Sequence, residues 1–174
     1  MEEIKRALMK CGALLLGEFT LASGKKSTYY IDIKRAITDP SILSIIADKI
    51  VSLISKNGIR FDKIAGVVVG SIPLAVAVSL KTGIPYVMVR KERKDHGTGK
   101  MIEGIVEKGE RIIIIEDVVT SGVSASEAAT ILRNAGAIVD YVIAIVDREE
   151  GAKDFLKSIN IELIPLLKSM DLLG

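Results

Sequence analysis

The sequence predicts an α/β fold in which a parallel central sheet is flanked by helices on both faces. Short apolar segments of strand length recur from residue 64 onward, and segments with helical spacing separate them. Strands buried on both faces read as continuous apolar runs, and their alternation with helices is typical of parallel sheets. A chain of 174 residues is long enough for one sizeable core and short for two domains, so we expect residues 1–174 to form a single domain.

The first 36 residues are predicted to form a helix and extended segments. Residues 2–11 have the spacing of a short amphipathic helix, which Gly12 ends. Strand-like runs follow at 18–21 and 29–33, with a Ser-Gly turn signal between them. These elements precede the alternating strands and helices.

The longest helical pattern covers residues 41–56, where apolar residues recur every three or four positions. Pro40 stands at its start and Asn57-Gly58 at its end. Strands and helices then alternate in the predicted order strand 64–69, helix 73–81, strand 86–89, strand 111–115, helix 125–134, strand 138–146, helix 151–158 and strand 161–166.

The composition argues against several classes of protein. Lys and Arg number 24 against 22 Asp and Glu, a formal net charge of +2, so a global basic field for nucleic acid is not indicated. The single cysteine, Cys11, excludes an intrachain disulfide and a cysteine-rich metal site. The charged N-terminal segment does not resemble a signal peptide, and no apolar run approaches the ~20 residues of a membrane span. We therefore expect a cytoplasmic protein that binds neither nucleic acid nor membrane.

The stretch IIIIEDVVTSGVSAS, residues 112–126, joins four isoleucines to two acids and a loop of small and hydroxylated residues. Adjacent carboxylates at the mouth of a buried strand are costly unless something outside uses them. Glu116 and Asp117 suit the vicinal hydroxyls of a ribose, or Mg²⁺ bound through water. The loop around Gly122 leads into a predicted helix, whose N-terminus suits a phosphate. Together these features indicate a phosphosugar site at the carboxyl edge of the sheet.

A plain strand–turn–helix connection, with Ser124 as the N-cap, is the simpler interpretation of the same stretch. It explains one serine and leaves the paired acids and the other hydroxyl residues unexplained. A P-loop is excluded, because the spacing GxxxxGK[ST] and its lysine are absent. The stretch resembles the phosphoribosyl-diphosphate motif of the type I phosphoribosyltransferases. This resemblance implies the fold of that family, with a small N-terminal hood to which residues 1–36 contribute.

The resemblance also implies roles for the residues of the stretch. The acids hold ribose hydroxyls, the loop that follows holds the 5′-phosphate, and Asp117 takes part in catalysis. Mg²⁺ is the implied cofactor, bound through phosphoribosyl diphosphate near the two acids. The implied binding residues for phosphoribosyl diphosphate are Glu116, Asp117, Val118, Val119, Thr120, Ser121, Gly122, Val123 and Ser124.

Residues 90–100 read RKERKDHGTGK and carry a local net charge of +3. Most charge runs are solvated surface loops, and a lone histidine is usually structural. This run, however, follows a predicted strand of the parallel sheet, so we expect it at the same edge as the acidic stretch. A flexible cationic loop at that place can neutralise a departing pyrophosphate and exclude water.

The same run resembles the catalytic loop of orotate phosphoribosyltransferases, whose pattern is Arg-Lys-x-x-Lys-x-His-Gly. Arg90, Lys91, Lys94 and His96 occupy the named positions of the pattern. The resemblance implies that these four residues bind phosphoribosyl diphosphate and that Lys94 and His96 act in catalysis. It also implies a homodimer in which the 90–100 loop is shared across the interface.

Residues 19–36, FTLASGKKSTYYIDIKRA, resemble the N-terminal segment of that family. The resemblance implies that Tyr29 and Tyr30 lie against the pyrimidine ring, although by itself the pair reads as two surface tyrosines on a strand. Orotate carries a carboxylate, and a guanidinium is the side chain suited to a bidentate grip on it. Arg148 follows a predicted strand at the same edge, and the resemblance implies that Arg148 and Thr120 bind orotate.

Two positions depart from the family pattern, since Ala22 and Gly70 stand where many members carry lysines. The sequence nevertheless predicts a member of this family that uses orotate and phosphoribosyl diphosphate. One alternative is a phosphoribosyltransferase for a purine base, which has no need of a carboxylate clamp. Another is a non-catalytic regulator that binds phosphoribosyl diphosphate and nucleic acid, for which the sequence offers no separate basic face and no helix-turn-helix extension.

Overall fold

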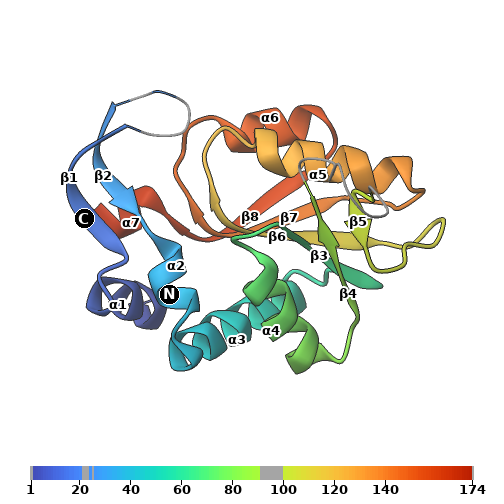
Figure 1. Cartoon of the computed structure of the whole chain (residues 1–174), viewed down its shortest axis with the longest axis horizontal. Helices are drawn as coiled ribbons and strands as arrows, with labels where there is room; N and C mark the ends of the chain where they lie inside the picture. The colour runs from blue at the N-terminus through green and yellow to red at the C-terminus, as the bar shows by residue number, and fades with distance from the viewer. Residues whose placement is uncertain (1, 21–23, 25, 91–99, 174) are drawn as a thin grey trace.

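The computed structural model describes residues 2–20, 24, 26–90 and 100–173. A six-stranded sheet forms the centre of this part of the chain, in the order β5-β4-β3-β6-β7-β8 (Figure 1). Its strands are β3 (Lys63–Val67), β4 (Tyr86–Val89), β5 (Ile102–Glu103), β6 (Ile112–Val119), β7 (Tyr141–Asp147) and β8 (Glu162–Lys168). Among these strands the short edge strand β5 pairs antiparallel, and all the other pairs are parallel. The predicted α/β fold with a mainly parallel sheet is confirmed.

Helices cover both faces of the sheet because its central strands are apolar on both sides. Along β6, Ile113 and Ile115 pack into one core, whereas Ile112 and Ile114 pack into the other. Helices α3 and α4 share the first core and α5 and α6 the second, and Figure 1 shows the two pairs on opposite sides of the sheet. Their bounds are α3 (Pro40–Lys56), α4 (Ile72–Thr82), α5 (Val123–Asn134) and α6 (Ala152–Ser158).

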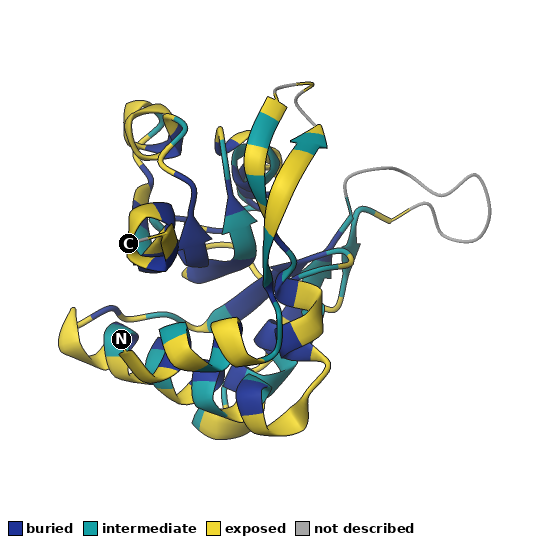
Figure 2. Cartoon of the chain, turned by 90° about the vertical axis from the view of Figure 1, so that its left-hand side faces the viewer, coloured by how far each residue is buried: buried dark blue, intermediate teal, exposed yellow. Residues whose placement is uncertain are grey.

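The N-terminal segment builds a separate two-stranded sheet beside this core. Helix α1 (Glu2–Lys10) leads into an antiparallel pair, β1 (Leu14–Thr20) and β2 (Lys26–Ile31), which we call the hood hairpin. Helix α2 (Ile33–Ile37) follows, and Figure 2 shows much of the hairpin as exposed. The last residue of β2 and the first of α2 are buried in the core shared with α3 and α4, so the base of the hairpin is anchored. Helix α7 (Ser169–Leu173), near the other end of the chain, lies beside α1.

Most predicted elements are present, and the differences have physical causes. The strand predicted at 111–115 is extended to Val119, because Glu116, Val118 and Val119 continue the pairing with β7. The sequence pattern does not predict α2, β5 or α7, since each has five residues or fewer and is too short to show a period. Within the described ranges, no helix has both the length and the apolar character that crossing a membrane requires.

An ion pair joins two neighbouring segments at the amino end of the sheet. Lys63 Nζ lies 2.6 and 2.7 Å from the two carboxylate oxygens of Glu110, and the Glu107 N–H donates a 2.7 Å hydrogen bond to the same carboxylate. The Glu107 N–H and the Lys63 ammonium group hold the pKa of the Glu110 carboxyl below its ordinary value. The pair thus joins the start of β3 to the residue two positions before β6.

Candidate active site

Four connections leave the carboxyl ends of β3, β4, β6 and β7, which meet at one edge of the parallel sheet. They begin at Val68, Arg90, Thr120 and Arg148. Apart from Tyr29 and Tyr30, every predicted site residue that the structure describes belongs to β6, to one of these connections or to the first turn of α5. The strand order therefore gathers the predicted residues at the edge where α/β proteins bind ligands.

Glu116 is buried, with 5% of the residue exposed, and hydroxyl groups from two other parts of the chain lie within hydrogen-bond distance of its carboxylate. Ser124 Oγ lies 3.0 Å from Oε1, and Ser71 Oγ lies 3.3 Å from Oε2. Ser71 is itself fully buried, and its Oγ accepts a 2.7 Å hydrogen bond from the Val67 N–H. The Ser71 hydroxyl hydrogen is shared between Glu116 and the Val67 carbonyl, which lies 3.0 Å from Oγ. Such donors offset the cost of burying a carboxylate. Glu116 therefore joins β6 to the β3–α4 turn and to α5.

Asp117, the second acid, is only partly buried. The Val118 N–H donates a 2.9 Å hydrogen bond to its Oδ1. The backbone of Gly70 lies against the same carboxylate, because a Cβ atom at position 70 would be 2.6 Å from Asp117 Oδ2. A glycine therefore fits this place, where many members of the resembled family carry a lysine. Asp117 is the acid of the pair that keeps surface for a ligand.

The loop after β6 is short and ends in the N-terminus of α5. Gly122 is the N-cap of this helix, with φ at +83°, and no side chain caps the helix. The interpretation of Ser124 as the N-cap is wrong, since its hydroxyl donates to Glu116 instead. The first N–H groups of a helix have no partner within the helix, so this uncapped end suits an anion. A Cβ atom on Gly122 would lie 3.2 Å from carbon atoms of Phe155 and Leu156, so α6 packs closely against the loop.

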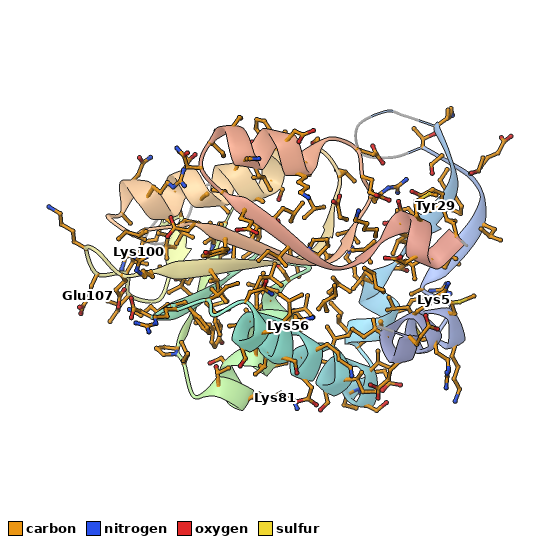
Figure 3. The ribbon with its side chains drawn as sticks, turned by 180° about the vertical axis from the view of Figure 1, so that it is seen from behind. Lys5, Tyr29, Lys56, Lys81, Lys100 and Glu107 are labelled. Carbon is orange, nitrogen blue, oxygen red and sulfur yellow. The ribbon has the colours of Figure 1, made fainter. Side chains whose placement is uncertain are left out.

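Arg148 joins this edge of the sheet to the hood hairpin. Its guanidinium carbon lies 4.5 Å from the centre of the Tyr29 ring, and its Nη2 donates a 3.1 Å hydrogen bond to Ser27 Oγ. Its Nε lies 2.9 Å from Glu150 Oε1, and the Arg148 side chain is 5% exposed. Figure 3 labels Tyr29 on the hairpin. The structure thus brings together two residues, Tyr29 and Arg148, that the sequence analysis assigns to orotate.

Tyr30 is not part of the contact with Arg148. Side chains alternate along a strand, so neighbouring tyrosines point to opposite faces. Tyr30 is 36% exposed and stacks on Phe19, with ring centroids 5.6 Å apart. Of the two tyrosines, Tyr29 is the one that contacts Arg148.

Part of the basic segment lies outside the described residues, including Lys91, Lys94 and His96. Arg90, at its start, is described. Its Nε and Nη2 donate hydrogen bonds of 3.2 and 3.1 Å to Glu103 Oε1 on β5. Arg90 thereby ties the end of β4 to the antiparallel edge strand that follows the segment.

Comparisons with known proteins agree with this geometry. Residues 34–162 match the model of the phosphoribosyl transferase domain. The chain is 49% identical over 172 residues to the orotate phosphoribosyltransferase of Methanosarcina acetivorans, covering 99% of this chain and 91% of the relative. The chain belongs to the orotate phosphoribosyltransferase family.

Solved structures support the same membership. The crystal structure of orotate phosphoribosyltransferase from Aeropyrum pernix has a TM-score of 0.89 and 34% identity, covering 98% of this chain and 96% of that chain. The structure of Leishmania donovani UMP synthase has a TM-score of 0.87 and 34% identity, covering 98% of this chain and 37% of that chain. The resemblance inferred from the acidic and basic stretches, and the type I phosphoribosyltransferase fold that it implies, are confirmed.

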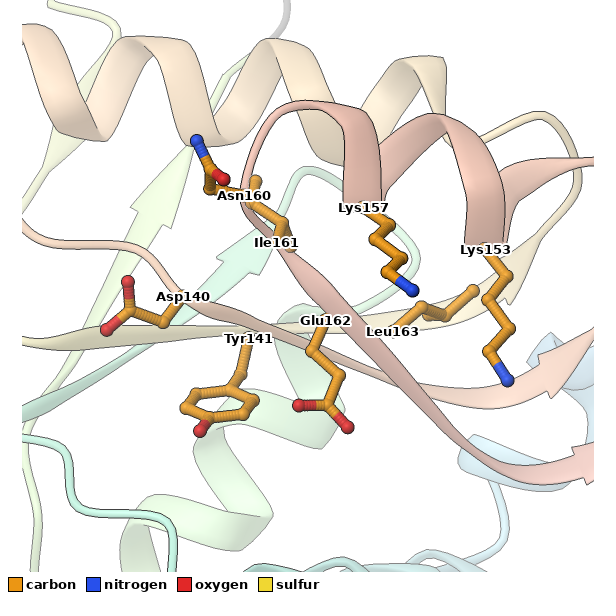
Figure 4. Close-up of a pocket in the computed structure, with 8 residues that line it drawn as sticks. All are labelled: Asp140, Tyr141, Lys153, Lys157, Asn160, Ile161, Glu162 and Leu163. Carbon is orange, nitrogen blue, oxygen red and sulfur yellow. The ribbon is translucent and has the colours of Figure 1, made fainter.

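A cavity of about 580 Å³ lies away from the candidate active site (Figure 4). It is found beside the first residues of β7 and β8 and beside α6, whereas the predicted site residues of the main sheet lie at the carboxyl ends of the strands. Its lining residues are Asp140, Tyr141, Lys153, Lys157, Asn160, Ile161, Glu162 and Leu163. Asp140 already pairs with Arg111 at 3.0 Å.

Sequence analysis does not identify Ser27 and Glu150, which both contact Arg148. Ser27 lies two residues before Tyr29, so strand alternation places both side chains on one face of β2, and this signal is available in the sequence. No sequence signal singles out Glu150 as the acid that contacts Arg148, because the neighbouring Glu149 has the same side chain. The backbone conformation at residue 149 distinguishes the two acids.

Proposed function

We propose that this chain transfers the phosphoribosyl group from phosphoribosyl diphosphate to orotate, giving orotidine 5′-monophosphate and pyrophosphate. The observation that carries the proposal is the contact of Arg148 with Tyr29, at the sheet edge that also holds the acidic pair and the open end of α5. A cation beside an aromatic ring suits a flat base with a carboxylate. Membership in the orotate phosphoribosyltransferase family supports the same choice of base.

The proposed phosphosugar site uses the stretch from Glu116 to Ser124. The N–H groups at the start of α5 and the hydroxyls of Thr120 and Ser121 hold the 5′-phosphate. Asp117, with its partly exposed carboxylate, holds ribose hydroxyls. Glu116 is assigned to the same sugar, and its contacts with Ser71 and Ser124 hold the β3–α4 turn and the start of α5 in place.

The proposed chemistry is a displacement at the ribose carbon through an oxocarbenium-like state. It needs positioning and stabilisation of the charge on the departing pyrophosphate more than a covalent nucleophile. We assign Lys94 and His96 to the pyrophosphate oxygens, where they stabilise the charge, with Arg90 and Lys91 as further cations of the loop. The turn at Gly70 presents backbone groups to the same oxygens. Thr120 and Arg148 hold orotate.

Mg²⁺ is the proposed cofactor. Among the described residues no three His, Cys, Asp or Glu side chains come together as a metal cage, so the ion would be bound mainly through diphosphate oxygens. Asp117, partly exposed at the sheet edge, fits as a further contact to the ion through water. When bound, Mg²⁺ supplies positive charge that neutralises the diphosphate.

We also propose a homodimer. Lys100, just after the segment that contains Lys94 and His96, lies toward the opposite end of the molecule from Tyr29 (Figure 3). A segment that ends so far from the hood hairpin is suited to serve the site of a partner copy. Leu80 on α4 is 81% exposed, and Ile105, two residues after β5, is 73% exposed. Such apolar residues suit burial against a second copy.

Two further expectations complete the proposal. The hood hairpin and the main sheet share one core, which supports a single domain over residues 1–174. Orotate and phosphoribosyl diphosphate are anions, which do not cross a membrane unaided. We therefore place the reaction in the cytoplasm.

The test is the loss of orotate absorbance in the ultraviolet when the purified protein is mixed with phosphoribosyl diphosphate and Mg²⁺. We expect orotate to be consumed, and Lys94→Ala to be slower by about 10²-fold or more, the range that one lost charge-stabilising group produces. Adenine, guanine and uracil are assayed in parallel. Conversion of a purine with no loss of orotate would refute the proposed substrate while keeping the transfer reaction. Binding of phosphoribosyl diphosphate without conversion of any base would favour the regulator.

A further inference from the structure

The guanidinium of Arg148 is held from two sides of the candidate active site. Glu150 contacts it from the same turn, and Ser27 contacts it from the hood hairpin. We propose that Glu150 and Ser27 are positioning residues that orient Arg148 toward the carboxylate of the base. This inference rests on the proposed function and assigns roles to two residues that act through Arg148.

The backbone around Arg148 is fixed by three hydrogen bonds. The Arg148 N–H donates to the Val119 carbonyl at 2.9 Å, which continues the β6–β7 pairing beyond β7. The Arg148 carbonyl accepts a 3.2 Å hydrogen bond from Ser169 Oγ on α7. The Glu149 N–H donates to Asp147 Oδ1 at 2.8 Å. The Cα atom that carries the guanidinium is thus set by the sheet and by α7.

The conformation of Glu149 directs Glu150 back onto the arginine. Its φ is +59°, in the left-handed region that non-glycine residues seldom adopt. Residues in sparsely populated conformations persist where the surroundings over-determine them, and they cluster at ligand sites. Here the turn places the Glu150 carboxylate 2.9 Å from Arg148 Nε, while Glu149 points to Lys168 and Ser169. Two adjacent acids therefore have different roles.

The two contacts occupy one part of the guanidinium group. Nε is paired with the Glu150 carboxylate by charge at 2.9 Å, without hydrogen-bond geometry, and Nη2 donates to Ser27. Nη1 has no hydrogen bond to any described residue. A guanidinium has five N–H groups in a planar fork, so N–H groups remain for a ligand carboxylate. Tyr29 covers one face of the plane and limits its rotation. A ligand meets an arginine that is already ordered, and it does not incur the entropic cost of ordering a long side chain.

A purely structural role for Arg148 is the competing interpretation. In that case the arginine only fastens the hood hairpin to the core, and loss of Glu150 or Ser27 reduces stability without distinguishing the two substrates. In our interpretation, loss of either residue weakens the binding of orotate selectively. Arg148 is assigned to orotate and not to phosphoribosyl diphosphate, so the two Michaelis constants separate the interpretations.

The experiment compares two matched pairs of variants. Glu150→Gln is paired with Glu149→Gln, which removes the same charge one residue away. Ser27→Ala is paired with Thr28→Ala, which trims the exposed neighbour on the opposite face of β2. For each variant, kcat, the KM of orotate, the KM of phosphoribosyl diphosphate and the melting temperature are measured on the full chain.

We expect Glu150→Gln to raise the KM of orotate about tenfold and Ser27→Ala about threefold, in keeping with losses of a charged and a neutral contact. The KM of phosphoribosyl diphosphate and kcat stay within about twofold, and both control variants resemble the unaltered chain. Unchanged orotate KM values, or equal shifts for Glu149→Gln and Glu150→Gln, overturn the inference while the proposed function stands. Equal shifts in both Michaelis constants with a lower melting temperature favour the structural role and also overturn it. Failure of the unaltered chain to convert orotate overturns the proposed function and the inference together.

Discussion

The Ser71 hydroxyl lies 3.3 Å from Glu116 Oε2 and joins the turn after β3 to the acid on β6. Both residues are buried, and Ser71 Oγ also accepts the Val67 N–H at 2.7 Å. One hydroxyl thus accepts from a buried backbone donor, and its single hydrogen is shared between the Val67 carbonyl at 3.0 Å and the buried Glu116 carboxylate at 3.3 Å. It also fixes the β3–α4 turn relative to the loop that we assign to the phosphosugar.

Ser71→Ala is expected to reduce both stability and the binding of phosphoribosyl diphosphate. It leaves the Val67 N–H without its partner, at a cost of about 1–3 kcal/mol for an unsatisfied buried donor. It also removes one donor from Glu116. Chemical denaturation and the KM of phosphoribosyl diphosphate measure the two effects. Ser124→Ala is the comparison, because it removes the other Glu116 donor and leaves the Val67 N–H paired. Equal stability of the two variants would contradict this account of Ser71.

Arg148→Ala is expected to weaken orotate binding by about 10- to 100-fold, as for the loss of charge-assisted hydrogen bonds. It also leaves Glu150 without the cation at 2.9 Å, so a modest loss of stability accompanies the loss of affinity. Isothermal titration with orotate and with phosphoribosyl diphosphate checks the selectivity. Arg111→Ala removes an exposed arginine that pairs with Asp140, and it should leave both affinities unchanged. Equal weakening of both ligands by Arg148→Ala would remove Arg148 from the base site.

Gly122→Ala is expected to destabilise the protein more than Gly83→Ala. Both glycines have positive φ, +83° and +71°, so both alanine variants meet the same backbone penalty of about 1–2 kcal/mol. At Gly122 the new Cβ would also lie 3.2 Å from Phe155 and Leu156, whereas nothing lies within 4 Å at Gly83. Thermal unfolding measures the difference, and the KM of phosphoribosyl diphosphate should rise for Gly122→Ala alone. A melting temperature for Gly122→Ala at or above that of Gly83→Ala would show that α6 moves away freely.

The Lys63–Glu110 pair predicts a pH dependence of stability. The pKa of Glu110 is below its ordinary value of 4.5 because of the Glu107 N–H and the Lys63 ammonium group. A carboxyl whose pKa is lowered on folding stabilises the protein above the unfolded pKa, and the stabilisation is lost as the pH falls through the folded pKa. We expect Glu110→Gln to cost about 0.5–1 kcal/mol at pH 7, the upper range for pairs near the surface, and progressively less below the ordinary pKa.

Urea denaturation of Glu110→Gln and of the unaltered chain between pH 7 and pH 3 measures this trend. Glu107→Gln is the matched control, since Glu107 contributes its backbone N–H and not its exposed side chain. A difference between Glu110→Gln and the unaltered chain that stays constant, or grows, toward acid pH would exclude the ion pair as its source.

Much of the fold could be predicted because its strands are apolar over their whole length. The pattern from residue 64 onward gives the alternation, and the alternation gives the shared carboxyl edge. The end of β6 could not be predicted, because Glu116 is polar in sequence but paired with Ala144 in the sheet. Local charge was therefore a poor guide to where this strand ends.

The site could be predicted only as far as residue types allow. The motif names Arg148 and Tyr29, but their contact spans the hood hairpin and the main sheet, and no local pattern encodes it. Tyr30 has the same side chain as Tyr29 but lies on the opposite face of the strand, where it packs against Phe19. Glu150 depends on the left-handed turn at Glu149, which is decided by the surrounding hydrogen bonds and not by the residue itself.

The hood hairpin has a consequence for the order in which parts of the molecule open. Two strands alone are marginally stable, and this pair is anchored at its base and by Arg148. Its opening therefore needs far less free energy than global unfolding. Amide hydrogen exchange should be faster at Tyr29 than at Ile114 by several orders of magnitude. Such a fluctuation separates Ser27 and Tyr29 from the guanidinium while the sheet stays folded. The fraction of time that the hairpin stays closed therefore equals the fraction of molecules in which Arg148 is ordered for the base.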